Sequence, residues 1–101
     1  MKIEFYYFEN CPSYEISLQN LKDVIKDSAV NAELDIIRID SVEDAEKFTF
    51  QGSPSIKING KDIEDRNDTY SFNCRLYKIE GKLTGVLTKE YLLLKLKDIA
   101  G

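Results

Sequence analysis

The stretch Ile3-Glu4-Phe5-Tyr6-Tyr7-Phe8-Glu9-Asn10-Cys11-Pro12-Ser13-Tyr14 decides how the chain is organised. Its first half is an aromatic, β-prone run, which predicts a buried strand that Asn10 interrupts. Pro12 suits the first turn of a helix, where the N–H that proline lacks would have no partner, so a helix is expected beyond Ser13. Cys11 therefore lies between a strand end and a helix start, where backbone N–H groups and the helix dipole favour a thiolate.

The composition describes one ordinary globular domain. The 101 residues are 43% apolar and 32% charged, and the net charge is −4. Such a chain builds a single core, and it has no basic stripe of the kind that nucleic-acid binding requires. No apolar run reaches the length of a membrane span, and Met1-Lys2 leads directly into the first strand instead of a secretion signal. The sequence predicts a single cytoplasmic domain, residues 1–101, with neither nucleic acid nor membrane as a partner.

Two cysteines and the absence of histidine limit the chemistry. Cys11 and Cys74 are too few for a disulfide scaffold, so in a reducing compartment we expect reactive thiols or plain core residues. Without histidine there is no Cys-His pair, no Ser-His-Asp triad and no His-bearing zinc site. Two thiolates also cannot complete a tetrahedral zinc site by themselves. We expect no resident metal or cofactor.

Hydrophobic periodicity predicts an alternation of strands and helices after the first strand. The expected helices span residues 13–28, 42–48 and 88–99, and the expected strands span 34–39, 55–58, 61–64 and 74–79. The first two strands should pair in parallel through a right-handed crossover. Asn59-Gly60 predicts a tight type I′ hairpin turn. Residues 49–53 and 65–73 are expected to be loops, and residues 80–85 a turn.

This order predicts an α/β domain with a mixed, four- to five-stranded sheet and helices on both faces. Three segments together resemble the thioredoxin fold: Phe5 to Pro12, Gly52-Ser53-Pro54-Ser55-Ile56, and Ile58-Asn59-Gly60-Lys61-Asp62-Ile63. The last of them is similar to the strand-turn-strand of glutaredoxins. Cys11-Pro12 with the later Cys74-Arg75-Leu76-Tyr77 also resembles a small thioredoxin-like family. The resemblance covers most of the chain, although residues 65–79 have no counterpart in a minimal glutaredoxin.

The resemblance implies a thiol-disulfide oxidoreductase with Cys11 as its nucleophile. Redox members of the superfamily use C-x-x-C, in which the second cysteine resolves the mixed disulfide, but Tyr14 stands at that position here. The resolving thiol would then be Cys74 or an external thiol, with glutathione as a co-substrate. The expected partner is a disulfide-bearing protein or a small thiol. On this hypothesis iodoacetamide should react faster with Cys11 than with Cys74.

The resemblance also implies a cis peptide bond between Ser53 and Pro54, beside Cys11. In the family, this segment leaves backbone groups free to pair with an extended peptide or with glutathione. The substrate-binding candidates are therefore Pro12, Ser13, Tyr14, Ser53 and Pro54.

Each candidate has an ordinary structural interpretation as well. Free cysteines are often buried as small apolar residues, but the position of Cys11 before a proline at a helix start favours a reactive thiol. For Cys74, core packing in an alternating strand is favoured over a pair with Cys11, because a disulfide requires Cα atoms within roughly 7 Å. Tyr14 is expected on the apolar face of its helix, and Ser13 is expected to cap that helix.

The sequence leaves three further interpretations, one for an acidic segment and two for the function of the domain. Glu64, Asp65 and Asp68 lack the spacing of a calcium loop and predict a solvated acidic loop. A non-catalytic binding module on the same frame remains an alternative function. So does a soft-metal site formed by Cys11 and Cys74, because two thiolates suit Cu(I) or Hg(II).

Overall fold

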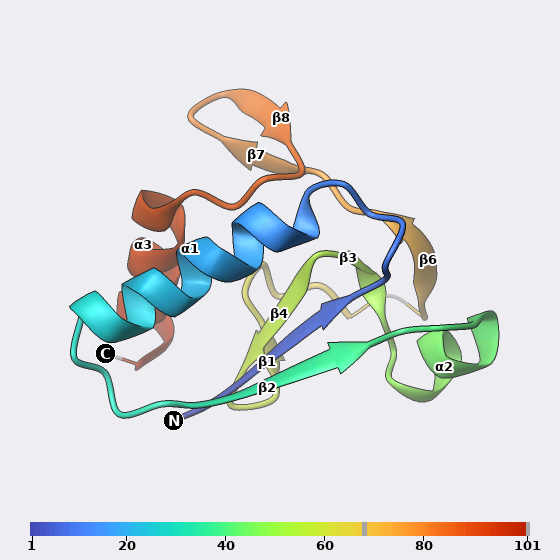
Figure 1. Cartoon of the computed structure of the whole chain (residues 1–101), viewed down its shortest axis with the longest axis horizontal. Helices are drawn as coiled ribbons and strands as arrows, with labels where there is room; N and C mark the ends of the chain where they lie inside the picture. Colours follow the sequence, from blue (N-terminus) through green and yellow to red (C-terminus); the bar gives the residue numbers. More distant parts are fainter. Residues whose placement is uncertain (68, 101) are drawn as a thin grey trace.

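The fold is built on a mixed four-stranded sheet. The computed structural model describes residues 1–67 and 69–100. The strand order is β2-β1-β4-β5, formed by β1 (Lys2–Tyr7), β2 (Glu33–Arg38), β4 (Ser55–Ile58) and β5 (Lys61–Asp62). Strand β1 is parallel to β2 and antiparallel to β4, which is in turn antiparallel to β5 (Figure 1). The predicted α/β class, the mixed sheet and the parallel pairing of the first two strands are confirmed.

Three helices accompany the sheet in the described part of the chain: α1 (Tyr14–Asp27), α2 (Val42–Lys47) and α3 (Lys89–Ala100). Figure 1 shows α1 and α3 side by side. None of these helices has both the length and the apolar character that crossing a membrane requires. The bounds match the predicted helices to within two residues.

Strand β1 has a buried residue on each face because successive side chains of a strand alternate. Phe5 points into the main core, where it meets residues of α1 and α3 such as Leu21 and Leu92. Tyr6 points the other way, into a second cluster that includes Ala45 of α2. The aromatic run of β1 thus joins two hydrophobic clusters, and the chain carries helices on both sides of it.

Side chains cap α2 and α3 but not α1. Ser41 Oγ accepts a hydrogen bond from Asp44 N at 3.1 Å, and Thr88 Oγ1 accepts one from Tyr91 N at 3.2 Å. Ser13 occupies the N-cap position of α1, but its side chain makes no capping hydrogen bond. The capping role predicted for Ser13 is therefore wrong.

The predicted hairpin turn is confirmed, and the strand after it is shorter than predicted. Asn59 and Gly60 both adopt positive φ, 53° and 84°, as a type I′ turn requires. Asn59 also binds Lys2 of β1, since its Oδ1 accepts from Lys2 N at 2.9 Å. Strand β5 ends at Asp62 because the Asp62 carboxylate turns back to accept a hydrogen bond from Glu64 N at 3.1 Å.

The second half of the chain forms two additional pairs of strands. Strand β3 (Gln51–Ser53) pairs in parallel with β6 (Ser71–Cys74), and β7 (Tyr77–Ile79) forms a hairpin with β8 (Lys82–Thr84). The predicted loops 49–53 and 65–73 are therefore wrong where these strands form. The predicted strand 74–79 is confirmed only in part: it is interrupted at Arg75 and Leu76, where the chain changes its partner from β3 to β8, and Tyr77–Ile79 forms β7. The turn predicted over 80–85 contracts to Glu80 and Gly81, and β8 follows it.

Candidate functional site

Cys11 is buried in the turn between β1 and α1. Only 2% of its surface is exposed, and its N–H donates to Phe8 O at 3.1 Å. Its thiol donates to Ser53 O at 3.5 Å. The peptide bond between Ser53 and Pro54 is cis. The expectation that a cis Ser53-Pro54 segment lies beside Cys11 is confirmed.

Cys74, from the other half of the chain, also lies next to Ser53. The parallel pairing of β3 with β6 sets Cys74 opposite Ser53, and Arg75 N donates to Ser53 O at 2.8 Å. One carbonyl oxygen therefore accepts from both the Cys11 thiol and the residue after Cys74. Cys74 is exposed, so its predicted core packing is wrong.

The two cysteines are neighbours, because the Cys11 thiol binds Ser53 O and Cys74 lies opposite Ser53 in the β3–β6 pairing. Partial burial of the Cys74 sulfur, and then the neighbouring Cys11 sulfur, raise the pKa of Cys74. Both cysteines are free thiols. The structure thus brings together the two candidate catalytic residues, although β1 and β6 lie far apart in the sequence.

The candidates on α1 differ in exposure. Pro12 is exposed, whereas Ser13 and Tyr14 are half-buried. The Tyr14 ring stacks on Tyr7 at 4.3 Å between centroids, and its hydroxyl donates to Glu15 Oε1 at 3.4 Å. The expectation that Tyr14 packs on the apolar face of its helix is confirmed.

The Ser53-Pro54 segment is buried, and the chain itself occupies its carbonyl groups. Ser53 O accepts from Cys11 and Arg75, and Pro54 O accepts from the Tyr77 hydroxyl at 2.6 Å. The resemblance implied backbone groups left free here for an external peptide. In this protein β6 lies along that edge, and Cys74 is the residue it presents next to Cys11.

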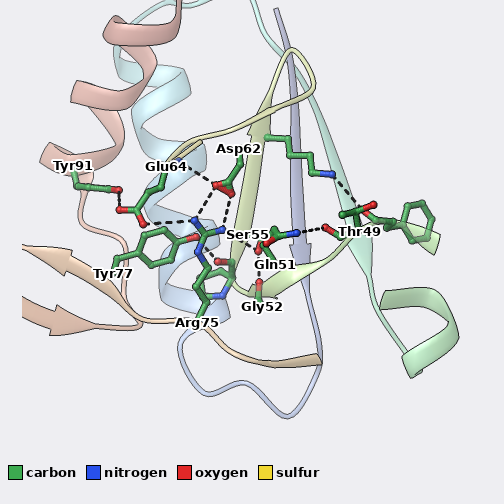
Figure 2. Close-up of polar contacts among 12 residues, drawn as sticks. Thr49, Gln51, Gly52, Ser55, Asp62, Glu64, Arg75, Tyr77 and Tyr91 are labelled. Carbon is green, nitrogen blue, oxygen red and sulfur yellow. Dashed lines mark hydrogen bonds and ion pairs between the residues drawn. The ribbon is translucent and has the colours of Figure 1, made fainter. Parts of the chain in front are cut away.

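Arg75, the residue after Cys74, forms a buried ion pair that the sequence did not indicate. Arg75 is 2% exposed, and its Nη1 and Nη2 donate to the two carboxylate oxygens of Asp62 at 2.7 and 2.9 Å (Figure 2). The guanidinium also lies over the Tyr77 ring, 4.5 Å from its centroid. Such a two-pronged pair fixes the direction of both side chains. It anchors the residue that follows Cys74 to β5.

Glu64 extends this cluster to α3. Its carboxylate lies 3.6 Å from Arg75 Nη2 and accepts the Tyr91 hydroxyl at 2.6 Å. Burial alone would lower the pKa of Arg75, but the hydrogen bonds to Asp62 and the surrounding negative charge raise it overall. The guanidinium therefore stays charged. We call Asp62, Glu64, Arg75, Tyr77 and Tyr91 the Arg75 cluster.

The predicted acidic loop separates into different environments. Glu64 is half-buried in the Arg75 cluster, so the prediction that it is solvated is wrong. Asp65 is exposed, with one carboxylate oxygen 3.9 Å from Lys61 Nζ, and Asp68 lies outside the described residues. Over residues 1–67 and 69–100, no group of three or more His, Cys, Asp or Glu side chains could hold a metal ion.

Comparison with known proteins gives no relative: no family model, no curated protein and no solved structure matches this chain.

Replacing Tyr77 with phenylalanine is expected to destabilise the protein by about 1–3 kcal/mol, because the buried Pro54 carbonyl loses its donor. Burial raises the pKa of Tyr77, so the hydroxyl is protonated and able to donate at neutral pH. Urea unfolding measures the change. Tyr70→Phe is the matched control on an exposed ring, where a change within about 0.5 kcal/mol is expected. Equal effects of the two substitutions would contradict the role of the Tyr77 hydroxyl.

Proposed function

We propose that this chain is a thioredoxin-like thiol-disulfide oxidoreductase whose reactive pair is Cys11 and Cys74. The convergence of Cys11 and Cys74 on Ser53 carries the proposal. Cys11 follows the first strand and precedes the first helix, and the strand order β2-β1-β4-β5 is parallel on one side of β1 and antiparallel on the other. These features support a thioredoxin-like frame with its reactive thiol at the usual place and its second thiol on β6.

The chemistry is a two-electron exchange between thiols and a disulfide. A thiolate attacks a substrate disulfide, a mixed disulfide forms, and the second protein thiol displaces the substrate. Two neighbouring thiols suit the second step, because the resolving sulfur has to reach the sulfur of the mixed disulfide. No histidine is present to take a proton, so the protons of the two thiols pass to solvent and to the departing thiolates. The partner is a disulfide-bearing protein or a small thiol.

Equilibration with mixtures of reduced and oxidised glutathione tests this proposal. We expect an internal Cys11–Cys74 disulfide, detected by mass spectrometry of the intact protein as the loss of two hydrogen atoms. The Cys74→Ser variant cannot form it and serves as the control. Because the pKa of Cys74 is raised, a smaller fraction of this cysteine is thiolate near neutral pH. The rate of disulfide formation should therefore still increase at pH values where the rate for an ordinary thiol has levelled off. A wild-type protein that only accumulates glutathione adducts would contradict the proposal.

The convergence of the two thiols also favours a second candidate, a two-coordinate Cu(I) site. Soft thiolate ligands select Cu(I), and two of them are sufficient for linear coordination. Competition with a coloured Cu(I) chelator measures the affinity. The Cys11→Ser and Cys74→Ser variants should each lose it, and equal competition by either variant and the wild type would exclude this candidate.

A further inference from the structure

We propose that the two thiols divide their roles in the reverse of the order that their sequence positions suggest. Cys74 attacks the external disulfide, and Cys11 resolves the mixed disulfide. This division of roles rests on the proposed thiol-disulfide exchange and specifies which sulfur meets the substrate.

The two thiols differ in their exposure to solvent. Cys11 is 2% exposed, and its sulfur faces the carbonyl of Ser53, with the buried Pro54 next in the chain. Disulfide exchange requires the attacking sulfur to touch a sulfur of the substrate, so its rate depends on access as well as on thiolate fraction. An external disulfide therefore cannot reach Cys11 unless the turn around it opens. Cys74 is exposed.

Access favours Cys74 in the first step and outweighs the smaller thiolate fraction that its raised pKa leaves near neutral pH. Cys74 is the last residue of β6, and its neighbour Asn73 is exposed too, so a substrate can approach from solvent. On the other side Arg75 is held by Asp62 through two hydrogen bonds. The backbone that carries Cys74 is thus fixed while its side chain remains accessible.

The proximity of the two cysteines suits the second step. Once Cys74 carries the substrate, its own sulfur becomes the atom to be attacked, and Cys11, whose thiol binds the carbonyl of the residue opposite Cys74, is its neighbour. Cys11 needs no access to solvent for this reaction. A buried thiol beside an exposed one is therefore placed to resolve, not to initiate.

Cys74 thiolate bonds to one substrate sulfur, the substrate S–S bond breaks, and the other half leaves as a thiolate. The Cys11 sulfur then bonds to the Cys74 sulfur, and the remaining substrate half leaves as a thiolate that takes up a proton. The substrate disulfide is reduced by two electrons to two thiols, and Cys11 and Cys74 are oxidised to a disulfide. A dithiol reductant returns the chain to its reduced form.

Single-turnover reactions with the uncharged disulfide 2,2′-dithiodipyridine test the order of attack, because each exchange releases a coloured thiopyridone. We expect Cys11→Ser to release one equivalent at the rate of the first wild-type phase and to retain an adduct on Cys74. Cys74→Ser should react at least tenfold more slowly. In urea the two variants should react at equal rates, because unfolding removes the difference in burial. A folded Cys74→Ser variant that reacts as fast as Cys11→Ser, or faster, would overturn the assignment.

The wild-type protein provides a second measurement that no substitution can disturb. A brief pulse of iodoacetamide on the reduced protein, followed by peptide mass spectrometry, should label Cys74 in large excess over Cys11. Preferential labelling of Cys11, or equal labelling of both, would overturn the assignment. The end state with 2,2′-dithiodipyridine separately tests the proposed function: two equivalents released with an internal disulfide support it, whereas stable adducts on both cysteines would contradict it.

Discussion

Replacing Arg75 with methionine is expected to lower the free energy of unfolding by about 3–5 kcal/mol, the typical effect of removing one partner from a buried ion pair. The side chains of Arg75 and Asp62 are 1% and 2% exposed. Without the guanidinium, the buried Asp62 carboxylate would lose its two hydrogen bonds to Arg75. Urea denaturation followed by circular dichroism measures the change.

The double variant Arg75→Met/Asp62→Leu is the control for this interpretation. Because it removes both charges, it should be more stable than Arg75→Met alone, by up to several kcal/mol. A double variant as unstable as the single one would show that packing, not the ion pair, dominates. Loss of less than about 1 kcal/mol in Arg75→Met itself would contradict the expected cost of an unpaired buried charge.

The second large effect is expected for Gly52→Ala, which should destabilise by about 2–4 kcal/mol through backbone strain and a close contact. Gly52 has a φ of +100°, and a Cβ there would lie 2.9 Å from Arg75 Cβ and 3.2 Å from Asn73 O. Both neighbours belong to the segment that pairs with β3. The added methyl group therefore pushes β6 away from the edge on which Cys74 is held.

Gly60→Ala is the matched control. Gly60 also has a positive φ, +84°, but a methyl group added there would meet nothing within 4 Å, so only the conformational cost of about 1 kcal/mol is expected. Both variants are compared by urea unfolding and by the rate of Cys11–Cys74 disulfide formation in glutathione. Gly52→Ala should slow that rate, and Gly60→Ala should leave it unchanged. If both variants slowed disulfide formation equally, the packing of β6 against β3 would not be what controls that rate.

The parts of the fold that the sequence predicted are those determined by neighbouring residues. The aromatic strand, the Pro12 helix start and the Asn59-Gly60 turn each depend on conformational preferences within a few residues. The position of Ser53-Pro54 beside Cys11 was instead implied by the resemblance to the thioredoxin fold. The local signals were strong because each one agrees with the hydrophobic pattern on both sides of it.

The pairing of β3 with β6 could not be predicted in the same way. Strand β3 is only three residues long, and its residues, Gln51, Gly52 and Ser53, are not apolar. It nevertheless pairs with β6. Which strand fills such an edge is decided by tertiary packing, which strand propensity does not contain. The proximity of Cys74 to Cys11 follows from this pairing, so the sequence left it as the less favoured interpretation.

Arg75 illustrates a different limit. The alternation over residues 74–79 was recognised, and its phase places Arg75, Tyr77 and Ile79 inward, with Cys74 and Leu76 exposed. Arginine is rarely buried without a partner, so this phase was not anticipated. The large apolar residues at 77 and 79 were the signal that pointed to it. The partner, Asp62, lies in another strand and becomes visible only when the sheet is formed.

The proximity of Cys11 and Cys74 has a thermodynamic consequence, because it brings together the start of the domain and its last third. In the proposed oxidised form, a covalent ring of about 60 residues would restrict the unfolded chain and stabilise the native state by roughly 4 kcal/mol. By linkage, the native state stabilises the bond by the same amount, so the bond is harder to reduce in the folded chain than in the unfolded one. Thermal stability and reduction potential should therefore change together across variants of this protein.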